Sequence, residues 1–191
     1  MPVGLRDEGV LSAAPASFLC VLWVLRFSQR HSASTASAKL KFSPMKIKIA
    51  WIGKTKNAAI QSLTDEYLKR ISRYAQVEGL SLGDEAALLR LGEKSGTRPA
   101  HRLVLLDSRG KTWCSEEFAR FLEDHQDRNP QPLVLAIGPA DGFSLQARQG
   151  ASATVSLGPM TFAHELARIV LLEQVYRAFT ILKGHPYHTG H

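Results

Sequence analysis

The sequence predicts an α/β domain with a mostly parallel sheet and helices on both faces. Strand-like runs alternate with helical patterns along most of the chain. Two runs, 103–106 and 133–137, are continuously apolar, which is typical of central strands covered on both faces. The chain has 191 residues, of which 45% are hydrophobic, so it can bury a core, and its length suits one domain.

In the first half of this domain, strands and helices are distinguished by their periods. Apolar residues alternate with others over 46–52, as in a strand, and Gly53 ends the run. Apolar residues spaced three and four apart over 57–74 predict an amphipathic helix. The next expected elements are a strand over 77–82 and a helix, capped by Asp84, that runs to about residue 93.

In the second half, buried strands are followed by helices. The strand over 103–106 ends at Asp107, where a loop over 107–111 is expected. Ser115, with Glu116 and Glu117, predicts an N-cap and an acidic first turn for a helix to about residue 125. The remaining expected elements are a strand over 133–137, a short helix over 144–149, a strand over 153–157 and a final helix over 162–182 with Thr161 as its cap.

Residues 1–44 precede this pattern and have a different character. Their apolar run, 17–25, is far shorter than the roughly 20 residues that span a bilayer. It has the length of a signal-peptide core, but Asp7 and Glu8 make the preceding stretch a poor match to a signal peptide. We therefore expect a start codon assigned too early, or a disordered leader, and a working domain over 45–191. A secreted protein with a cleaved leader is the alternative.

Composition and motifs exclude several classes of function. The net charge of +7 favours an anionic partner without distinguishing nucleic acid from membrane. Two cysteines are too few for a disulfide framework, which favours the cytoplasm, and no spacing suggests a metal site. The sequence lacks GxGxxG after the first strand, the phosphate-binding P-loop, HExxH and GxSxG. Common dinucleotide, hydrolase and metal mechanisms therefore lack their parts.

Three loops remain as candidate binding elements. In open α/β sheets, ligands bind beyond the carboxyl ends of the strands. The loops at these positions, 107–111, 138–142 and 158–161, contain Gly and, in two cases, Pro. Such loops allow the main chain to approach a ligand closely, although each by itself is also consistent with an ordinary tight turn.

The C-terminal region resembles a known family. The segment 157–179, followed by His185-Pro186-Tyr187-His188, resembles the end of the RlmH family of SPOUT-class methyltransferases. Ile137-Gly138 with Asp141-Gly142, and Leu106-Asp107 with Gly110-Lys111, resemble its other two loops in the same order. The resemblance extends from Met45 to the C-terminus.

This resemblance implies a C-terminal trefoil knot and S-adenosylmethionine as the cofactor. The residues implied to surround the cofactor are Leu106, Gly138, Gly158, Pro159, Met160, Thr161, Phe162 and Ala163. The sequence departs from the family at Pro139, where the family usually has glycine, and at Ala140, where it has proline. Because proline has no N–H, any cofactor contact made by that amide would be lost or shifted.

The resemblance also implies a reaction and its partners. The reaction is methyl transfer to N3 of a pseudouridine in 23S ribosomal RNA of the large subunit, without a metal. Tyr187, His188 and Arg168 are the catalytic candidates, and Arg168 and Arg177 are candidates for phosphate or base contacts. An equally open interpretation is that these arginines only form pairs on the helix surface. The resemblance further implies that the protein is a homodimer that acts on the ribosome or its large subunit. No membrane partner is expected.

Two other functions remain open at this point. One is a non-catalytic RNA- or ribosome-binding protein that kept the fold, for which Pro139 is the best support. The other is a SPOUT methyltransferase that modifies a different RNA, such as transfer RNA.

Overall fold

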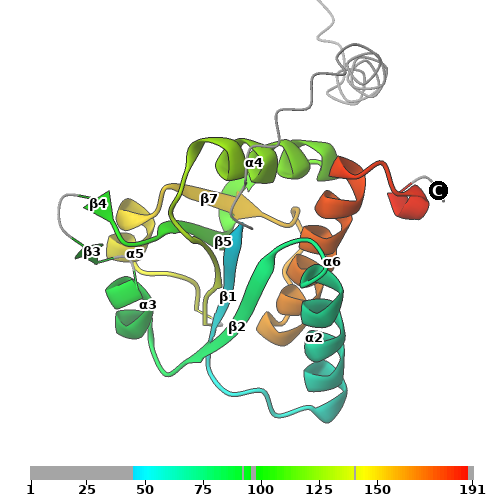
Figure 1. Ribbon diagram of the computed structural model, residues 1–191. Helices are drawn as coiled ribbons and strands as arrows, with labels where there is room; N and C mark the ends of the chain where they lie inside the picture. Colours follow the sequence, from blue (N-terminus) through cyan, green and yellow to red (C-terminus); the bar gives the residue numbers. More distant parts are fainter. Residues whose placement is uncertain (1–44, 92, 96–97, 140, 189–191) are drawn as a thin grey trace, which may run out of the picture. The chain divides into compact units, whose positions relative to one another are not determined.

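The structure is a computed structural model that describes residues 45–91, 93–95, 98–139 and 141–188 (Figure 1). Residues 1–44, for which a mis-called start or a leader was expected, lie outside the described residues. All of the elements below belong to the part of the chain from Lys41 to His191, which is one compact unit.

The main sheet has five strands, all parallel, in the order β2-β1-β6-β5-β7. This confirms the predicted α/β class. The central strand β6 is buried at every residue, as its continuous apolar run predicts. The strands are β1 (Lys46–Ile52), β2 (Gln76–Leu82), β5 (Arg102–Thr112), β6 (Leu133–Ile137) and β7 (Ala153–Ser156).

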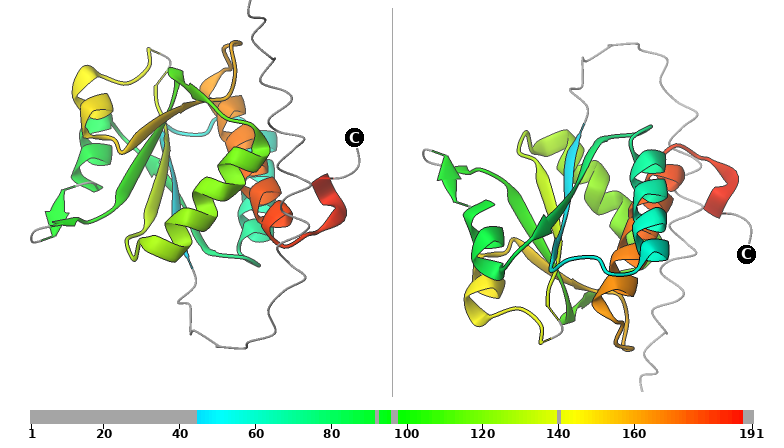
Figure 2. Two further views of the ribbon diagram at one scale, coloured as in Figure 1. Left: turned by 90° about the horizontal axis from the view of Figure 1, so that it is seen from above. Right: turned by 90° about the horizontal axis from the view of Figure 1, so that it is seen from below.

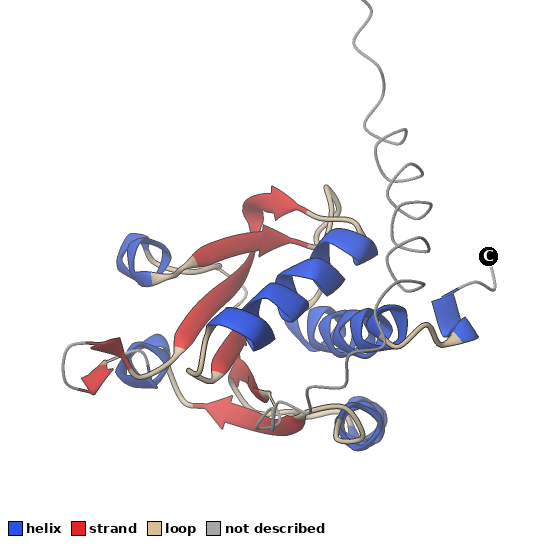
Figure 3. Ribbon diagram, turned by 45° about the horizontal axis from the view of Figure 1, so that its top comes forward, coloured by secondary structure: helices blue, strands red, loops and turns tan. Residues whose placement is uncertain are grey.

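Helices cover both faces of the sheet (Figures 2 and 3). On one face lie α2 (Ala58–Ile71), α4 (Ser115–Arg128) and α6 (His164–Leu182), and on the other lie α3 (Glu85–Leu91) and α5 (Leu145–Gly150). Each face has its own cluster of buried hydrophobic side chains. Within the described ranges, no helix combines the length and the apolar character needed to cross a membrane.

The sequence predicted the presence of the helices more accurately than the residues that cap their N-termini. Asn57 and Asp84 accept main-chain hydrogen bonds at the starts of α2 and α3, and the Asp84 cap is confirmed. The prediction that Thr161 caps the final helix was wrong, because α6 begins at His164 and its N-cap is Ala163, which makes no side-chain hydrogen bond. Ser115 is the first helical residue of α4 rather than its cap. The antiparallel pair β3 (Lys94–Ser95) and β4 (Arg98–Pro99) was missed, because strands of two residues have no visible period.

The largest correction concerns β5. The expected loop over 107–111 lies inside this strand, which continues to Thr112. Leu106 pairs with Val155 of β7, and after a register shift Lys111 pairs with the same residue. A Cβ atom on Gly110 would lie 2.6 Å from the main-chain N and C atoms of Val155. Only glycine therefore allows the two main chains to approach this closely.

This close approach predicts a strong effect of Gly110→Ala. The added methyl group would overlap main-chain atoms, which no rotamer change can move, so the variant should lose about 3 kcal/mol of unfolding free energy. Urea denaturation measures the loss. Gly83→Ala is the matched control, because a Cβ there meets nothing within 4 Å. Equal urea midpoints for both variants and the unmodified protein would show that the strands can separate at no cost.

Candidate functional site

A hollow of about 440 Å³, here called the edge cleft, opens beside the middle of β5 and at the carboxyl ends of β6 and β7. Its lining comes from residues 106–109 of β5 and from the two loops that follow β6 and β7. Seven of the eight residues expected around a cofactor line it, namely Leu106, Gly138, Gly158, Met160, Thr161, Phe162 and Ala163. The eighth, Pro159, is exposed and is not part of the lining. Pro139 lines the cleft, and its carbonyl accepts the N–H of Gly142 at 3.0 Å.

The loop after β7 has a main-chain shape that requires glycine. Gly158 has a φ of +136°, a conformation that residues with a side chain rarely adopt. The hydroxyl of Ser156, buried at the end of β7, accepts the N–H of Gly158 at 3.2 Å and lies 2.9 Å from its carbonyl oxygen, to which it donates. These contacts fix the loop as it leaves the sheet, so that Met160 and Phe162 follow at the rim of the cleft.

Asp107 gives the cleft a buried negative charge that the sequence interpretation did not single out. Its carboxylate accepts the main-chain N–H of Arg109 at 3.0 Å and the side-chain Nε and Nη2 of Arg109 at 3.1 and 3.2 Å. Nη1 of Arg148 lies 3.8 Å away. Burial alone would raise the pKa of Asp107, but the hydrogen bonds and charge of Arg109 hold it below its usual value. Its position directly after the apolar run 103–106 was the feature of the sequence that could have identified Asp107 as a site residue.

Arg168 belongs to α6, and its side chain is buried in the protein rather than part of the cleft lining. Only 1% of the residue is exposed, and its guanidinium lies 4.4 Å from the ring centroid of Trp51. Its Nη1 donates to the hydroxyl of Thr55 at 2.8 Å. Among the described residues, no acceptor lies within hydrogen-bond distance of its Nε and Nη2. Burial lowers the pKa of this guanidinium. Arg168 therefore joins α6 to the loop after β1, and an RNA contact would require it to move.

Tyr187 contacts the middle of α6 and is not part of the cleft lining. Its hydroxyl donates to Glu173 at 3.3 Å, and its ring packs against Tyr176 with centroids 5.0 Å apart. Arg177 pairs with the same carboxylate at 2.7 Å. At 1.5 Å per residue, Glu173 lies about 9 Å along the helix from Ala167, the last residue of α6 that lines the cleft. The structure therefore does not bring Tyr187 together with the cleft of its own chain.

His188 ends the short helix η1 (Pro186–His188), and its side chain lies outside what the structure describes. Burial, followed by the charge of Glu173, raises the pKa of Tyr187. The phenol therefore stays protonated at neutral pH and acts as a hydrogen-bond donor rather than as a base.

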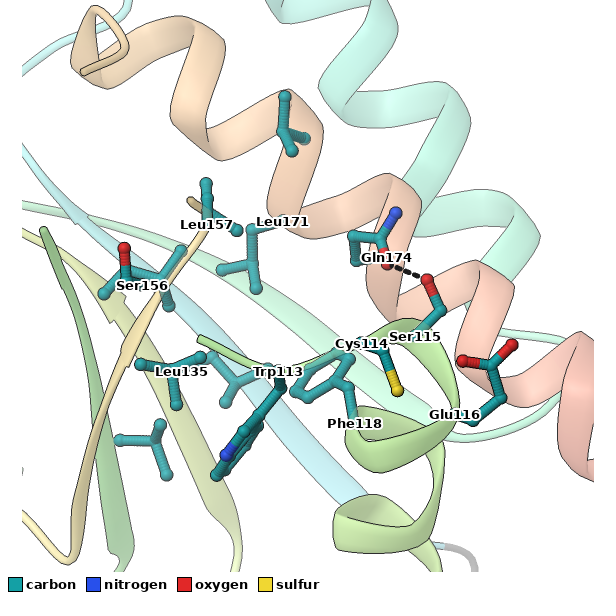
Figure 4. A pocket seen from close by; sticks show the side chains of 14 residues that line it. Trp113, Cys114, Ser115, Glu116, Phe118, Leu135, Ser156, Leu157, Leu171 and Gln174 are labelled. Carbon is teal, nitrogen blue, oxygen red and sulfur yellow. Dashed lines mark hydrogen bonds between the residues drawn. The ribbon is translucent and has the colours of Figure 1, made fainter. Parts of the chain in front are cut away.

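A second hollow of about 420 Å³, here called the helix cavity, lies between α4, α6 and strands β5 and β7 (Figure 4). Trp113, Phe118 and Leu135 form part of its apolar lining, and Ser115 and Gln174 supply polar groups. Sequence reasoning did not find this hollow, because its lining comes from five separate elements. Among the residues that the structure describes, no group of three His, Cys, Asp or Glu side chains is placed to hold a metal ion.

Comparisons with known proteins agree with this arrangement. A family model described as "Predicted SPOUT methyltransferase" matches residues 45–188. Ribosomal RNA large subunit methyltransferase H of Koribacter versatilis is 56% identical over 147 residues, which are 77% of this chain and all of that protein. The protein of the same name from Geotalea daltonii is 45% identical over 152 residues, covering 75% of this chain and 99% of that protein.

One solved structure supports the fold alone. A probable methylase family protein from Haemophilus influenzae superimposes with a TM-score of 0.50 at 10% identity, covering 75% of this chain and 70% of that one.

The buried carboxylate predicts a specific pH dependence. Because the pKa of Asp107 is lower in the folded than in the unfolded chain, ionisation of Asp107 stabilises the fold above its unfolded pKa, about 3.9. That stability is lost as the pH falls through the folded value. The unfolding free energies of the unmodified protein and Asp107→Asn should therefore differ at pH 7, and the difference should shrink as the pH falls from about 4 through the lower pKa of the folded chain.

Asp141→Asn is the control, because Asp141 is exposed in the same cleft. A constant difference between the unmodified protein and Asp107→Asn from pH 7 to pH 3 would contradict the assignment.

Proposed function

Because this chain belongs to the SPOUT methyltransferase family, we propose that it methylates large-subunit ribosomal RNA with S-adenosylmethionine as the donor. The observation that carries this proposal is the 56% identity to a protein named Ribosomal RNA large subunit methyltransferase H, covered over its whole length. The acceptor we propose is N3 of a pseudouridine, as the resemblance to the RlmH family implies. The ribosome or its large subunit would be the partner, in the cytoplasm.

The edge cleft suits S-adenosylmethionine in size and chemistry. Its volume of about 440 Å³ lies within the range of small-molecule sites, roughly 300–1,000 Å³. Leu106, Met160 and Phe162 offer apolar surface for a flat base, and β5 and the two loops after β6 and β7 offer main-chain groups for its edge. The Asp107 carboxylate also lines the cleft, where it is paired with Arg109. When bound, this cofactor supplies an electrophilic methyl group, while the protein orients the acceptor base and helps it lose its proton.

A homodimer would complete the site. Tyr187 is held at Glu173, about 9 Å along α6 from Ala167 at the cleft of its own chain, and its proposed catalytic role, with His188, is at the cleft of a second copy. Met160, Phe162 and Leu166 are 72%, 41% and 51% exposed around the start of α6. Apolar side chains grouped in this way are typical of a surface that a partner covers. The tail of one copy would then act at the cleft of the other.

Two further expectations come from the resemblance to the family, namely a role for Arg168 and the trefoil knot. Arg168 would act through the position of α6, and the trefoil knot stays an expectation of the resemblance. The main-chain contact between Gly110 and Val155 supports a chain path that is tightly packed at this place.

A non-catalytic ribosome-binding protein is the second candidate. Pro139, which lines the cleft and has no N–H, favours it. Calorimetry with S-adenosylmethionine separates the two candidates, because a protein that only binds ribosomes would release no heat.

Methyl transfer from labelled S-adenosylmethionine to ribosomes tests the proposal directly. The unmodified protein and Gly83→Ala should label large-subunit RNA. Gly158→Val should bind the cofactor roughly tenfold more weakly or worse, because valine is strained at a φ of +136°. Circular dichroism checks that the variant folds. Absence of labelling by the unmodified protein on both ribosomes and isolated subunits would contradict the function.

Mixed dimers test the shared site. Tyr187→Phe alone should lower methyl transfer by roughly tenfold or more while cofactor affinity stays within about twofold. Refolding Tyr187→Phe together with Gly158→Val should restore activity, because the intact cleft of one chain would meet the intact tail of the other. If the mixture stays as inactive as its components, the tail acts within its own chain.

A further inference from the structure

The helix cavity adjoins the edge cleft. Both are lined by Leu106, Ser156 and Leu157, so the two hollows meet beside the middle of β5 and the end of β7. Along α6 they follow one another, because Ala167 lines the cleft and Leu171 and Gln174 line the cavity. A group held in the cavity therefore lies next to one held in the cleft, as methyl transfer between a donor and an acceptor requires.

The walls of the cavity differ in chemistry (Figure 4). Trp113 and Phe118 lie together at one side, with ring centroids 6.2 Å apart. Ser115 and Gln174 face each other at another side, and Ser156 and Leu157 lie across the cavity from them. Aromatic surface beside a few polar groups is how proteins hold a single nucleobase taken out of its stack.

A hydrogen-bond chain determines which polar atom the cavity presents. The Glu173 carboxylate, paired with Arg177, only accepts hydrogen bonds, so Nε2 of Gln174 must donate to it at 2.7 Å. The Oε1 atom of Gln174 therefore faces Ser115, which must donate its hydroxyl hydrogen at 2.8 Å. The lone pairs of the Ser115 oxygen remain for a ligand. The cavity thus offers an acceptor to a ligand that carries an N–H.

We propose that the helix cavity holds the target pseudouridine, with its ring against Trp113 and its N1–H donated to the hydroxyl oxygen of Ser115. This rests on the proposed function. Pseudouridine is joined to ribose through carbon and keeps an N–H at both ring nitrogens, whereas the N1 atom of uridine carries the ribose. The two nitrogens point in different directions, so N3 can face the edge cleft while N1–H faces Ser115. Ser115 then distinguishes pseudouridine from uridine, and Gln174 is a positioning residue that orients its hydroxyl.

The test compares ribosomes whose target position is pseudouridine with ribosomes in which it is uridine. The unmodified protein should prefer pseudouridine in kcat/KM. Ser115→Ala and Gln174→Leu should reduce this preference roughly tenfold, the value of one hydrogen bond, while Ser115→Thr keeps it. Trp113→Leu should raise the KM for both ribosomes roughly tenfold, and Trp113→Phe should restore it. Ser72→Ala, a hydroxyl at the far end of α2, is the matched control.

A second measurement reports on binding without methyl transfer. Pseudouridine nucleoside should quench the tryptophan fluorescence of the unmodified protein at concentrations at which N1-methylpseudouridine, which lacks the N1–H, quenches at least threefold less. Ser115→Ala should respond equally to both nucleosides.

The outcomes separate this inference from the proposed function. If the unmodified protein methylates neither ribosome, the function itself is wrong. If it methylates them but Ser115→Ala keeps the full preference for pseudouridine, the inference is overturned. It is also overturned if Trp113→Leu or Gln174→Leu converts the protein to monomers, because a second copy then fills the cavity. Cofactor affinity unchanged in all variants, with the preference lost only in Ser115→Ala and Gln174→Leu, supports the inference.

Discussion

The site depends on the contact between the main chains of Gly110 and Val155. The chain at Gly110 lies so close to β7 that any side chain would overlap main-chain atoms. Because of this contact, β7 lies beside β5, and the loop that follows it, from Gly158 onward, lies beside Leu106 and Gly138. Without it, β5 and the loops after β6 and β7 would not form the walls of one cleft.

The edge cleft, the helix cavity and Tyr187 follow one another along helix α6. Its first turn borders the edge cleft, its second and third turns border the helix cavity, and Glu173 holds Tyr187 on the other side. Arg168, buried against Trp51, fixes the helix to the end of β1. A buried guanidinium with few partners is costly, so its presence indicates that the position of α6 matters more than the stability lost. One helix thereby sets the distances between the edge cleft, the helix cavity and Tyr187.

The hydrophobic periodicity of the sequence and its resemblance to a known family predicted much of the fold and of the cleft lining. The period-two run of β1 and the apolar run of β6 gave their strands nearly to the residue, because both patterns follow directly from burial. Seven of eight expected cleft residues line one hollow, since the ends of parallel strands meet at one edge. The cofactor contact itself stays a prediction.

The rest depended on contacts between distant residues, which no local pattern records. A loop was expected over 107–111 because its glycine and charged residues suit a turn, whereas β5 continues through this segment to Thr112 and its pairing with β7 overrides that preference. The hydrogen bond between Ser115 and Gln174 at the helix cavity joins residues 59 positions apart. The position of Tyr187 away from its own cleft likewise follows from a fold that the tail motif does not encode.

A crystal structure of the protein with S-adenosylmethionine tests the central claim most directly. The account predicts density for the cofactor in the edge cleft, in contact with Leu106, Gly138 and Met160, with β5 and β7 still packed at Gly110. Density elsewhere on the molecule, or a cleft whose loops have moved apart without the cofactor between them, would contradict it.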